Sequence, residues 1–198
     1  MINKKYVIKV NKFSLALFFS VPIIVSVAVL TMSAARDREA YLHFFTNPYI
    51  VTRFEPGFVS YGKILSLIGN AHFGVIFTIL ITYILLGISW QCLVSKPWLE
   101  SFLMFNGIAF GVFQYFIGTA IRNGLSMAIA VYAAVKVLEG QKRYIILLFL
   151  SPFIHYGTTL FVALVLLTLI TADVDRGLTR VLVVLLFLIV FLFFVPAY

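Results

Sequence analysis

Hydrophobic residues in this chain form long runs that short clusters of polar and charged residues interrupt. The runs cover residues 13–33, 71–94, 99–118, 121–138, 144–170 and 181–198. Each is close to the roughly 20 residues that an α-helix needs to cross the hydrocarbon of a bilayer. The pattern therefore predicts an all-α, polytopic integral membrane protein with about six transmembrane helices, which form a single transmembrane domain over residues 1–198.

Two places in this pattern predict irregular structure. Almost nothing separates the third run from the fourth, which requires a tight turn near residue 119. The fifth run is longer than one perpendicular crossing requires, so it is expected to be tilted or broken. Pro152 removes a backbone donor and Gly157 lowers the cost of a bend, which together predict a kink just before His155.

The polar segment 34–70 after the first run predicts two short interfacial helices. One begins near Asp37 and ends at Asn47-Pro48, and a second follows the turn at Glu55-Pro56-Gly57. Aromatic residues are frequent in both, which suits the headgroup region of a membrane. We therefore expect this segment to lie along the membrane surface.

Composition and charge are consistent with a membrane protein. Hydrophobic residues make up 63% of the chain, too much apolar surface for one small core to bury. The amino-terminal tail is basic and should stay in the cytoplasm, so segment 34–70 faces outward. A cleavable signal peptide is the alternative account of the first run. The net charge of +8 indicates contact with anionic lipid, and no basic-aromatic pattern predicts binding to nucleic acid. The single Cys92 excludes an internal disulfide.

Two ionisable residues in the apolar runs are candidates for function. Arg122 lies on the first turn of the fourth predicted helix, and His155 lies within the fifth run. A cation at a helix amino-terminus favours an anionic ligand such as a lipid-linked pyrophosphate. Arg122 could instead anchor its helix at the interface, and His155 could be an interhelical hydrogen-bond partner. Asp37 and Glu55 in the outward segment add two carboxylates on the same side.

The arrangement resembles the EpsG family of Wzy-like bacterial polysaccharide polymerases. The resemblance covers about residues 30–170 and rests on four motifs: Asp37-x-x-x-Tyr41, Glu55-x-Gly57-Phe58, Ile121-Arg122-Asn123-Gly124-Leu125 and Phe153-Ile154-His155. Members of the family are generally longer, so the resemblance implies an amino-terminal portion or a short member.

The resemblance implies a glycosyltransferase in the bacterial cytoplasmic (inner) membrane. It would join oligosaccharide repeat units carried on undecaprenyl pyrophosphate at the outer face, in O-antigen, capsule or exopolysaccharide biosynthesis. Arg122 would stabilise the departing pyrophosphate, with help from Arg36 or Arg38. Membrane lipid and other polysaccharide-assembly proteins, such as a chain-length regulator, are the expected partners.

An acceptor hydroxyl also needs a base, and three residues are candidates: Asp37, Glu55 and His155. Tyr41 would orient the acceptor or pack against sugar, and Asn123 would contact substrate. The chain offers no clustered acidic set, so we expect a reaction without a metal or another cofactor.

Three other functions are compatible with these residues. A lipid-linked glycan transporter or flippase would bind the head group without making a bond, and broken helices suit that role. A truncated, non-catalytic partner or inhibitor of a polymerase is a second alternative. A membrane acyltransferase, which also uses an intramembrane histidine, is the most distant.

Overall fold

The computed structural model describes residues 11–33, 37–50, 54–111, 118 and 120–171, and these residues form helices without any strand. Among them, three helices are long and apolar enough to cross a bilayer: α1 (Lys12–Ser33), α4 (Ala71–Leu93) and α6 (Ile121–Leu138). The first, second and fourth predicted spans are therefore confirmed as helices of sufficient length and apolar character. Asn70 caps α4 by accepting a hydrogen bond from the backbone N–H of Phe73, which explains why that helix begins where the polar segment ends.

The third predicted span is described only in part. Helix α5 (Trp98–Gly111) has 14 residues and is roughly 21 Å long, shorter than the roughly 30 Å of hydrocarbon. Residues 112–117 and 119 lie outside the described residues, and so does the sixth predicted span at 181–198. The structure therefore supports a helical membrane protein with three candidate spans in its described part.

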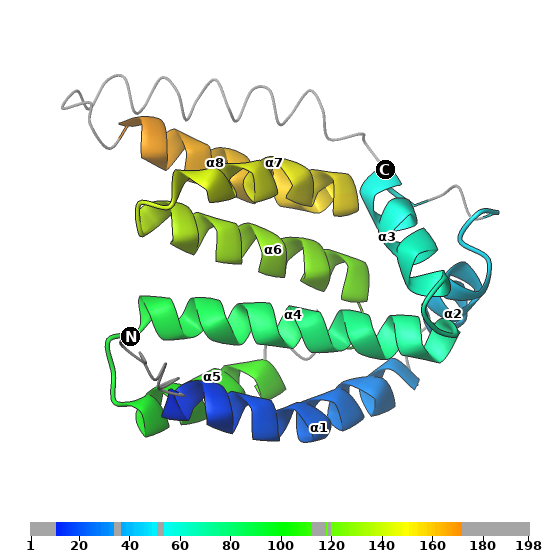
Figure 1. Cartoon of the computed structure of the whole chain (residues 1–198), viewed down its shortest axis with the longest axis horizontal. Coiled ribbons are helices and arrows are strands. Elements are labelled where there is room, and N and C mark those ends of the chain that lie inside the picture. The colour runs from blue at the N-terminus through cyan, green and yellow to red at the C-terminus, as the bar shows by residue number, and fades with distance from the viewer. Residues whose placement is uncertain (1–10, 34–36, 51–53, 112–117, 119, 172–198) are drawn as a thin grey trace, which may run out of the picture.

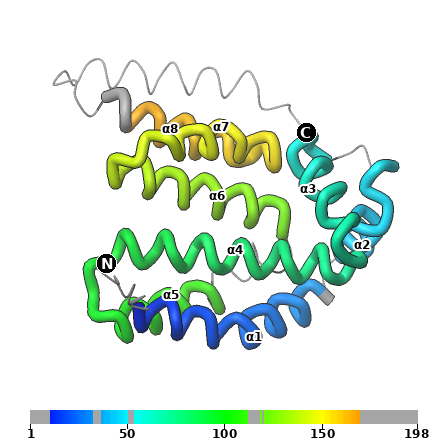
Figure 2. The backbone as a smooth tube through the Cα atoms, in the orientation of Figure 1, coloured from blue at the N-terminus to red at the C-terminus, as the bar shows by residue number. Residues whose placement is uncertain are grey.

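The fifth run does not form one crossing helix, and a prediction of a single span there is wrong. It is divided into 3-10 helix η2 (Lys142–Tyr144), α7 (Ile145–Ile154), 3-10 helix η3 (Tyr156–Thr158) and α8 (Thr159–Thr171). The chain reverses direction between α7 and α8, so these two helices form a hairpin beside α6 (Figure 2). The break falls at His155, whose backbone is extended (φ −156°, ψ 118°), where Pro152 and Gly157 predict a kink.

The hairpin is too short to cross a membrane twice. Helix α7 has 10 residues and is roughly 15 Å long, about half of the hydrocarbon thickness. Leu148 of α7 and Val162 of α8 join the same buried cluster against the alanines of α6. This packing is possible because α6 presents small side chains, which let neighbouring backbones approach closely. The hairpin therefore places His155, which lies in the middle of an apolar run, at one end of the bundle.

The helices are arranged in successive layers (Figure 1). Helices α1 and α5 lie on one side of α4, and α6 separates α4 from the α7–α8 hairpin. A buried tyrosine connects α1, α4 and α5, because the hydroxyl of Tyr83 donates to Asn106 over 2.9 Å and lies 2.6 Å from the Ser20 hydroxyl. Such interhelical hydrogen bonds satisfy polar groups that lipid cannot solvate.

The segment after α1 forms the two short helices that its sequence predicts, α2 (Arg38–Thr46) and α3 (Pro56–Ser66). Pro56 occupies the first turn of α3, where its missing N–H costs nothing. The two helices cover one end of the bundle, where α2 contacts α4 and α3 contacts α7 (Figure 1). Their inner faces form an aromatic cluster of Tyr41, Phe44, Phe45, Phe54, Phe58 and Tyr61.

Candidate functional site

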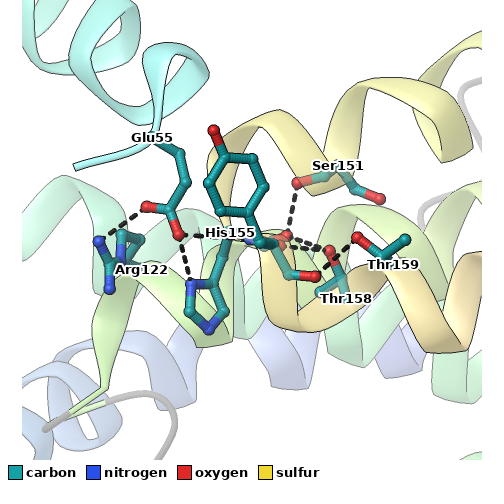
Figure 3. Close-up of polar contacts among 8 residues, drawn as sticks. Glu55, Arg122, Ser151, His155, Thr158 and Thr159 are labelled. Atoms are coloured by element: carbon teal, nitrogen blue, oxygen red, sulfur yellow. Dashed lines mark hydrogen bonds and ion pairs between the residues drawn. The ribbon is translucent and has the colours of Figure 1, made fainter. Parts of the chain in front are cut away.

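Three segments that are distant in sequence meet at the end of the bundle that α2 and α3 cover. Glu55 immediately precedes α3, Arg122 is the second residue of α6, and His155 lies at the turn of the α7–α8 hairpin. Figure 3 shows the Glu55 side chain between the other two. The imidazole lies at this end of the bundle because α7 ends there, directly before the chain turns back into α8.

Glu55 uses both of its carboxylate oxygens. Nη1 of Arg122 donates to Oε2 over 2.7 Å, and Nδ1 of His155 lies 2.9 Å from Oε1. The backbone N–H of Tyr156 also donates to Oε1, over 3.3 Å. The Glu55 side chain is 7% exposed, whereas those of Arg122 and His155 are 21% and 23% exposed. A carboxylate this buried requires such partners, since burying an unpaired charge is costly.

The same contacts satisfy backbone groups that the helix break would otherwise leave without partners. In lipid, non-helical backbone is tolerated only where protein or a water-filled cavity surrounds it. Glu55 accepts from the N–H of Tyr156, while the backbone N–H and the side-chain hydroxyl of Thr158 donate to the carbonyl of His155 over 3.1 and 2.8 Å. The irregular turn at His155 and the buried carboxylate of Glu55 therefore satisfy each other's polar groups.

A glycine allows α3 to approach the hairpin closely. A Cβ atom on Gly57 would lie 2.7 Å from the carbonyl oxygen of Phe153, closer than such atoms normally come. The next residue, Phe58, is completely buried in the aromatic cluster. These two contacts give the Glu55-x-Gly57-Phe58 motif a structural reason, because they fix the start of α3 against the end of α7.

A cavity of about 250 Å³ lies next to the ion pair. It is lined by Asp37, Ala40, Tyr41, Phe54 and Arg122. The guanidinium carbon of Arg122 lies 4.7 Å from the centre of the Phe54 ring, a cation–π distance that orients the side chain. A guanidinium has five N–H donors, so the pairing through Nη1 leaves donor capacity for an anionic ligand in this cavity.

Tyr41 is one of the residues that line the cavity. Its ring is buried, stacks on Phe54 and meets Phe58 edge to face. Burial raises the pKa of the Tyr41 hydroxyl, and the positive charge of Arg122 opposes that rise. The phenol therefore stays neutral near pH 7 and can donate a hydrogen bond to a ligand, but little of the ring is available to stack on a sugar.

The other residues predicted to bind substrate have different positions. Asp37 is exposed at the start of α2 and lines the cavity, whereas Arg38 and Asn123 are partly exposed and are not among its lining residues. Arg36 lies outside the described residues. Sequence reasoning assigned no ligand-site role to Phe54, although an aromatic residue immediately before a loop carboxylate was a signal that could have drawn attention to it.

The contact with Glu55 concerns one nitrogen of the imidazole. An ionised carboxylate can only accept hydrogen bonds, so Nδ1 of His155 is the donor to it, and in the neutral imidazole Nε2 is then the acceptor. A Cβ atom on Gly157 would lie 2.8 Å from Nε2, so a larger residue at position 157 would collide with this edge of the ring. Within the described ranges, no three His, Cys, Asp or Glu side chains gather in a way that could hold a metal ion.

Fold and site together define a helical membrane protein with a buried Glu–Arg–His cluster at one end of its bundle. The sequence model of the EpsG family matches residues 14–198, nearly the whole chain, and the chain belongs to this family. Membership points to a Wzy-like, polysaccharide-polymerase type of role at the membrane. No curated protein and no solved structure matches the chain.

Proposed function

We propose that this protein joins lipid-linked oligosaccharide repeat units by glycosyl transfer at the outer face of the bacterial cytoplasmic membrane. Undecaprenyl pyrophosphate is the proposed carrier, and O-antigen, capsule or exopolysaccharide is the proposed product. The observation that supports the proposal best is the Glu55 carboxylate, which bonds an arginine and a histidine at the same time. Such a cluster places a base beside a cation, the two elements that this reaction requires.

In the proposed reaction, the acceptor sugar hydroxyl attacks the anomeric carbon of the donor glycan. Nε2 of His155 takes the hydroxyl proton while the new glycosidic bond forms. Glu55 accepts from Nδ1 and stabilises the resulting imidazolium, a role that carboxylates have in other His-based sites. This assignment makes His155 the base and Glu55 a positioning residue, which narrows the three candidates that the sequence left open.

The bond between the anomeric carbon and the pyrophosphate oxygen breaks in the same step, and the lipid pyrophosphate leaves with the electron pair. Arg122 would stabilise the negative charge through guanidinium donors that the Glu55 contact does not use. Its place on the first turn of α6 adds the positive end of the helix dipole. Asp37 and the Tyr41 hydroxyl, from two other residues that line the cavity, are the proposed contacts of the acceptor sugar.

The distribution of charge supports an outward-facing site. Helices α4 and α6 begin at the end where the cluster lies, and their other ends are adjacent, since Lys136 contacts Cys92 there. The connections at that far end carry Lys96, Lys142 and Arg143. Basic residues in short connections favour the cytoplasmic side. The amino-terminus would then be cytoplasmic and the cluster extracytoplasmic.

The test is the chain-length distribution of surface polysaccharide in cells that lack the native gene and express variants. Arg122→Ala and His155→Ala should leave mainly single repeat units on the lipid carrier. The matched controls are Arg143→Ala and His72→Ala, which remove the same residue types at exposed positions that form no hydrogen bond or ion pair with the cluster in the described part of the chain. If both cluster variants accumulate in the membrane at normal levels and still give long polymer, the proposed function is wrong.

Transport of a lipid-linked glycan is a second candidate, because one observation favours it. Helices α7 and α8 are short and meet at an irregular turn in contact with Glu55, as broken helices in transporters do. A transporter would release intact substrate on the far side of the membrane. In Arg122→Ala cells, repeat units that stay on the cytoplasmic side would favour transport, and units that reach the outer side without being joined would favour polymerisation.

A further inference from the structure

A second group of polar side chains lies buried behind the Glu–Arg–His cluster. Ser126 of α6, Ser151 of α7 and Thr158 of η3 are each fully buried. The Ser126 hydroxyl donates to the backbone carbonyl of Ser151 over 2.7 Å and lies 2.8 Å from the Thr158 hydroxyl. Ser126 therefore contacts the hairpin on both sides of His155.

These contacts replace the backbone bonds that the break weakens. The N–H of His155 reaches the carbonyl of Ser151 only over 3.3 Å, a long bond at the end of α7. Ser126 gives the same carbonyl a much shorter partner, and Thr158 donates to the carbonyl of His155 (Figure 3). The two hydroxyls have two protons for three contacts, so two of the three hydrogen bonds form at any one time, and both side chains are buried.

Ser126 also lies one turn beyond Arg122 on α6, at the spacing i, i+4 that places two side chains on the same helix face. One rigid helix thus presents the guanidinium to Glu55 and the hydroxyl to the hairpin. Sites whose residues are held by such supporting contacts keep the geometry that chemistry requires.

We propose that Ser126 is a positioning residue, which clamps both arms of the α7–α8 hairpin so that His155 stays on Glu55. The consequence for glycosyl transfer rests on the proposed function, whereas the clamp itself is a structural property that can be measured separately. Among the described residues, the Ser126 hydroxyl makes no hydrogen bond to a cavity-lining residue or to the imidazole. Its effect on the reaction is therefore indirect.

The experiment compares Ser126→Ala with Ser89→Ala. Ser89 is a matched control, because it is equally buried in α4 but donates to Leu85 within its own helix. The full-length protein in lipid nanodiscs is treated with diethyl pyrocarbonate, which acylates imidazole, and modification of each histidine is followed by mass spectrometry. Ser126→Ala should raise the rate at His155 by several-fold, while Ser89→Ala leaves it unchanged and exposed His72 reacts equally in all proteins.

A second pair of variants tests the clamp from the hairpin side. Thr158→Val removes the hydroxyl with little change in shape and should raise His155 labelling, whereas Thr158→Ser keeps the hydroxyl and should not. This pair of variants also tests the clamp if the Ser126→Ala protein does not accumulate in the membrane. Unchanged His155 labelling in both Ser126→Ala and Thr158→Val, or equal labelling of Thr158→Val and Thr158→Ser, would overturn the clamp.

Polysaccharide chain length separates the clamp from the proposed function. If both hold, Ser126→Ala shortens the polymer and Ser89→Ala does not. If His155→Ala leaves polymer unchanged while Ser126→Ala still raises labelling, the clamp holds and the proposed function fails. Loss of polymer in His155→Ala together with wild-type polymer and labelling in Ser126→Ala would refute the clamp alone.

Discussion

Replacement of Glu55 by glutamine changes the charge of the cluster while keeping its shape. The amide oxygen of the new side chain can still accept from Nδ1 of His155 and from the N–H of Tyr156. The amide nitrogen, however, would face the guanidinium of Arg122, so two donors would meet where the structure has a 2.7 Å ion pair. Glu55→Gln therefore removes the ion pair and leaves most of the packing in place.

The expected loss in the free energy of unfolding follows from the burial of the three side chains. Removing one partner of a fully buried ion pair costs about 3–5 kcal/mol, and a hydrogen bond to a charged group is worth about 1.5–3 kcal/mol. Arg122 and His155 are 21% and 23% exposed, so solvent relieves part of the loss. We expect the free energy of unfolding to fall by about 2 kcal/mol, which lowers the unfolding midpoint by about 4–8 °C for a chain of this size.

The assay is thermal unfolding of the purified protein in nanodiscs, with Glu100→Gln as the control. Glu100 pairs with Lys96 at i, i+4, but both side chains are about half exposed, so that pair contributes at most about 0.5 kcal/mol. Glu55→Gln should also shorten the polysaccharide, because the imidazolium would lose its counterion. Equal unfolding midpoints for the two variants would refute the argument that Glu55 is held by a buried ion pair.

The remaining predictions concern geometry. Arg122→Lys keeps the charge but loses the planar fork of donors, so the polymer should be much shorter. Arg143→Lys at the far end of the bundle is the control and should leave polymer length unchanged. Unchanged polymer in Arg122→Lys would show that charge alone suffices. Gly57→Ala should destabilise the protein, because a Cβ would press on the carbonyl of Phe153. Gly107→Ala should be tolerated, since among the residues that the structure describes no heavy atom outside its own helix backbone lies within 4 Å of its Cβ position. Unfolding midpoints of the two alanine variants give the comparison, and equal values would contradict it.

Helix positions could be predicted well from the sequence where a run was long, apolar and bounded by clear signals. The predicted spans at 71–94 and 121–138 agree with α4 and α6 within one residue at each end. The two short helices before α4 were also predictable, since Asn47-Pro48 and Pro56 mark a stop and a start. The chain reversal within the fifth run was not predictable, because a bend and a reversal have the same local signals, Pro152 and Gly157.

The candidate site divides in the same way. Arg122, His155 and Glu55 each stood out by residue type and position, and their assignment to catalysis stays a prediction. Their pairing could not be read from the chain, because Glu55 is 67 residues from Arg122 and 100 from His155 in sequence. Sequence reasoning also gave Ser126 no role, since a serine in an apolar helix has no local signal for what it contacts.

The sequence by itself determined that this protein is helical and lies in a membrane, because hydrophobic length and backbone hydrogen bonding leave few alternatives in lipid. It also determined where the helix of the fifth run is interrupted, between Pro152 and Gly157. Only the tertiary structure decided that the chain turns back there and that His155 meets Glu55 and Arg122. The reason is physical. Local sequence patterns fix the dihedral preferences of a few residues. The path of the chain after a helix break depends instead on which distant helix offers small side chains and hydrogen-bond partners for packing.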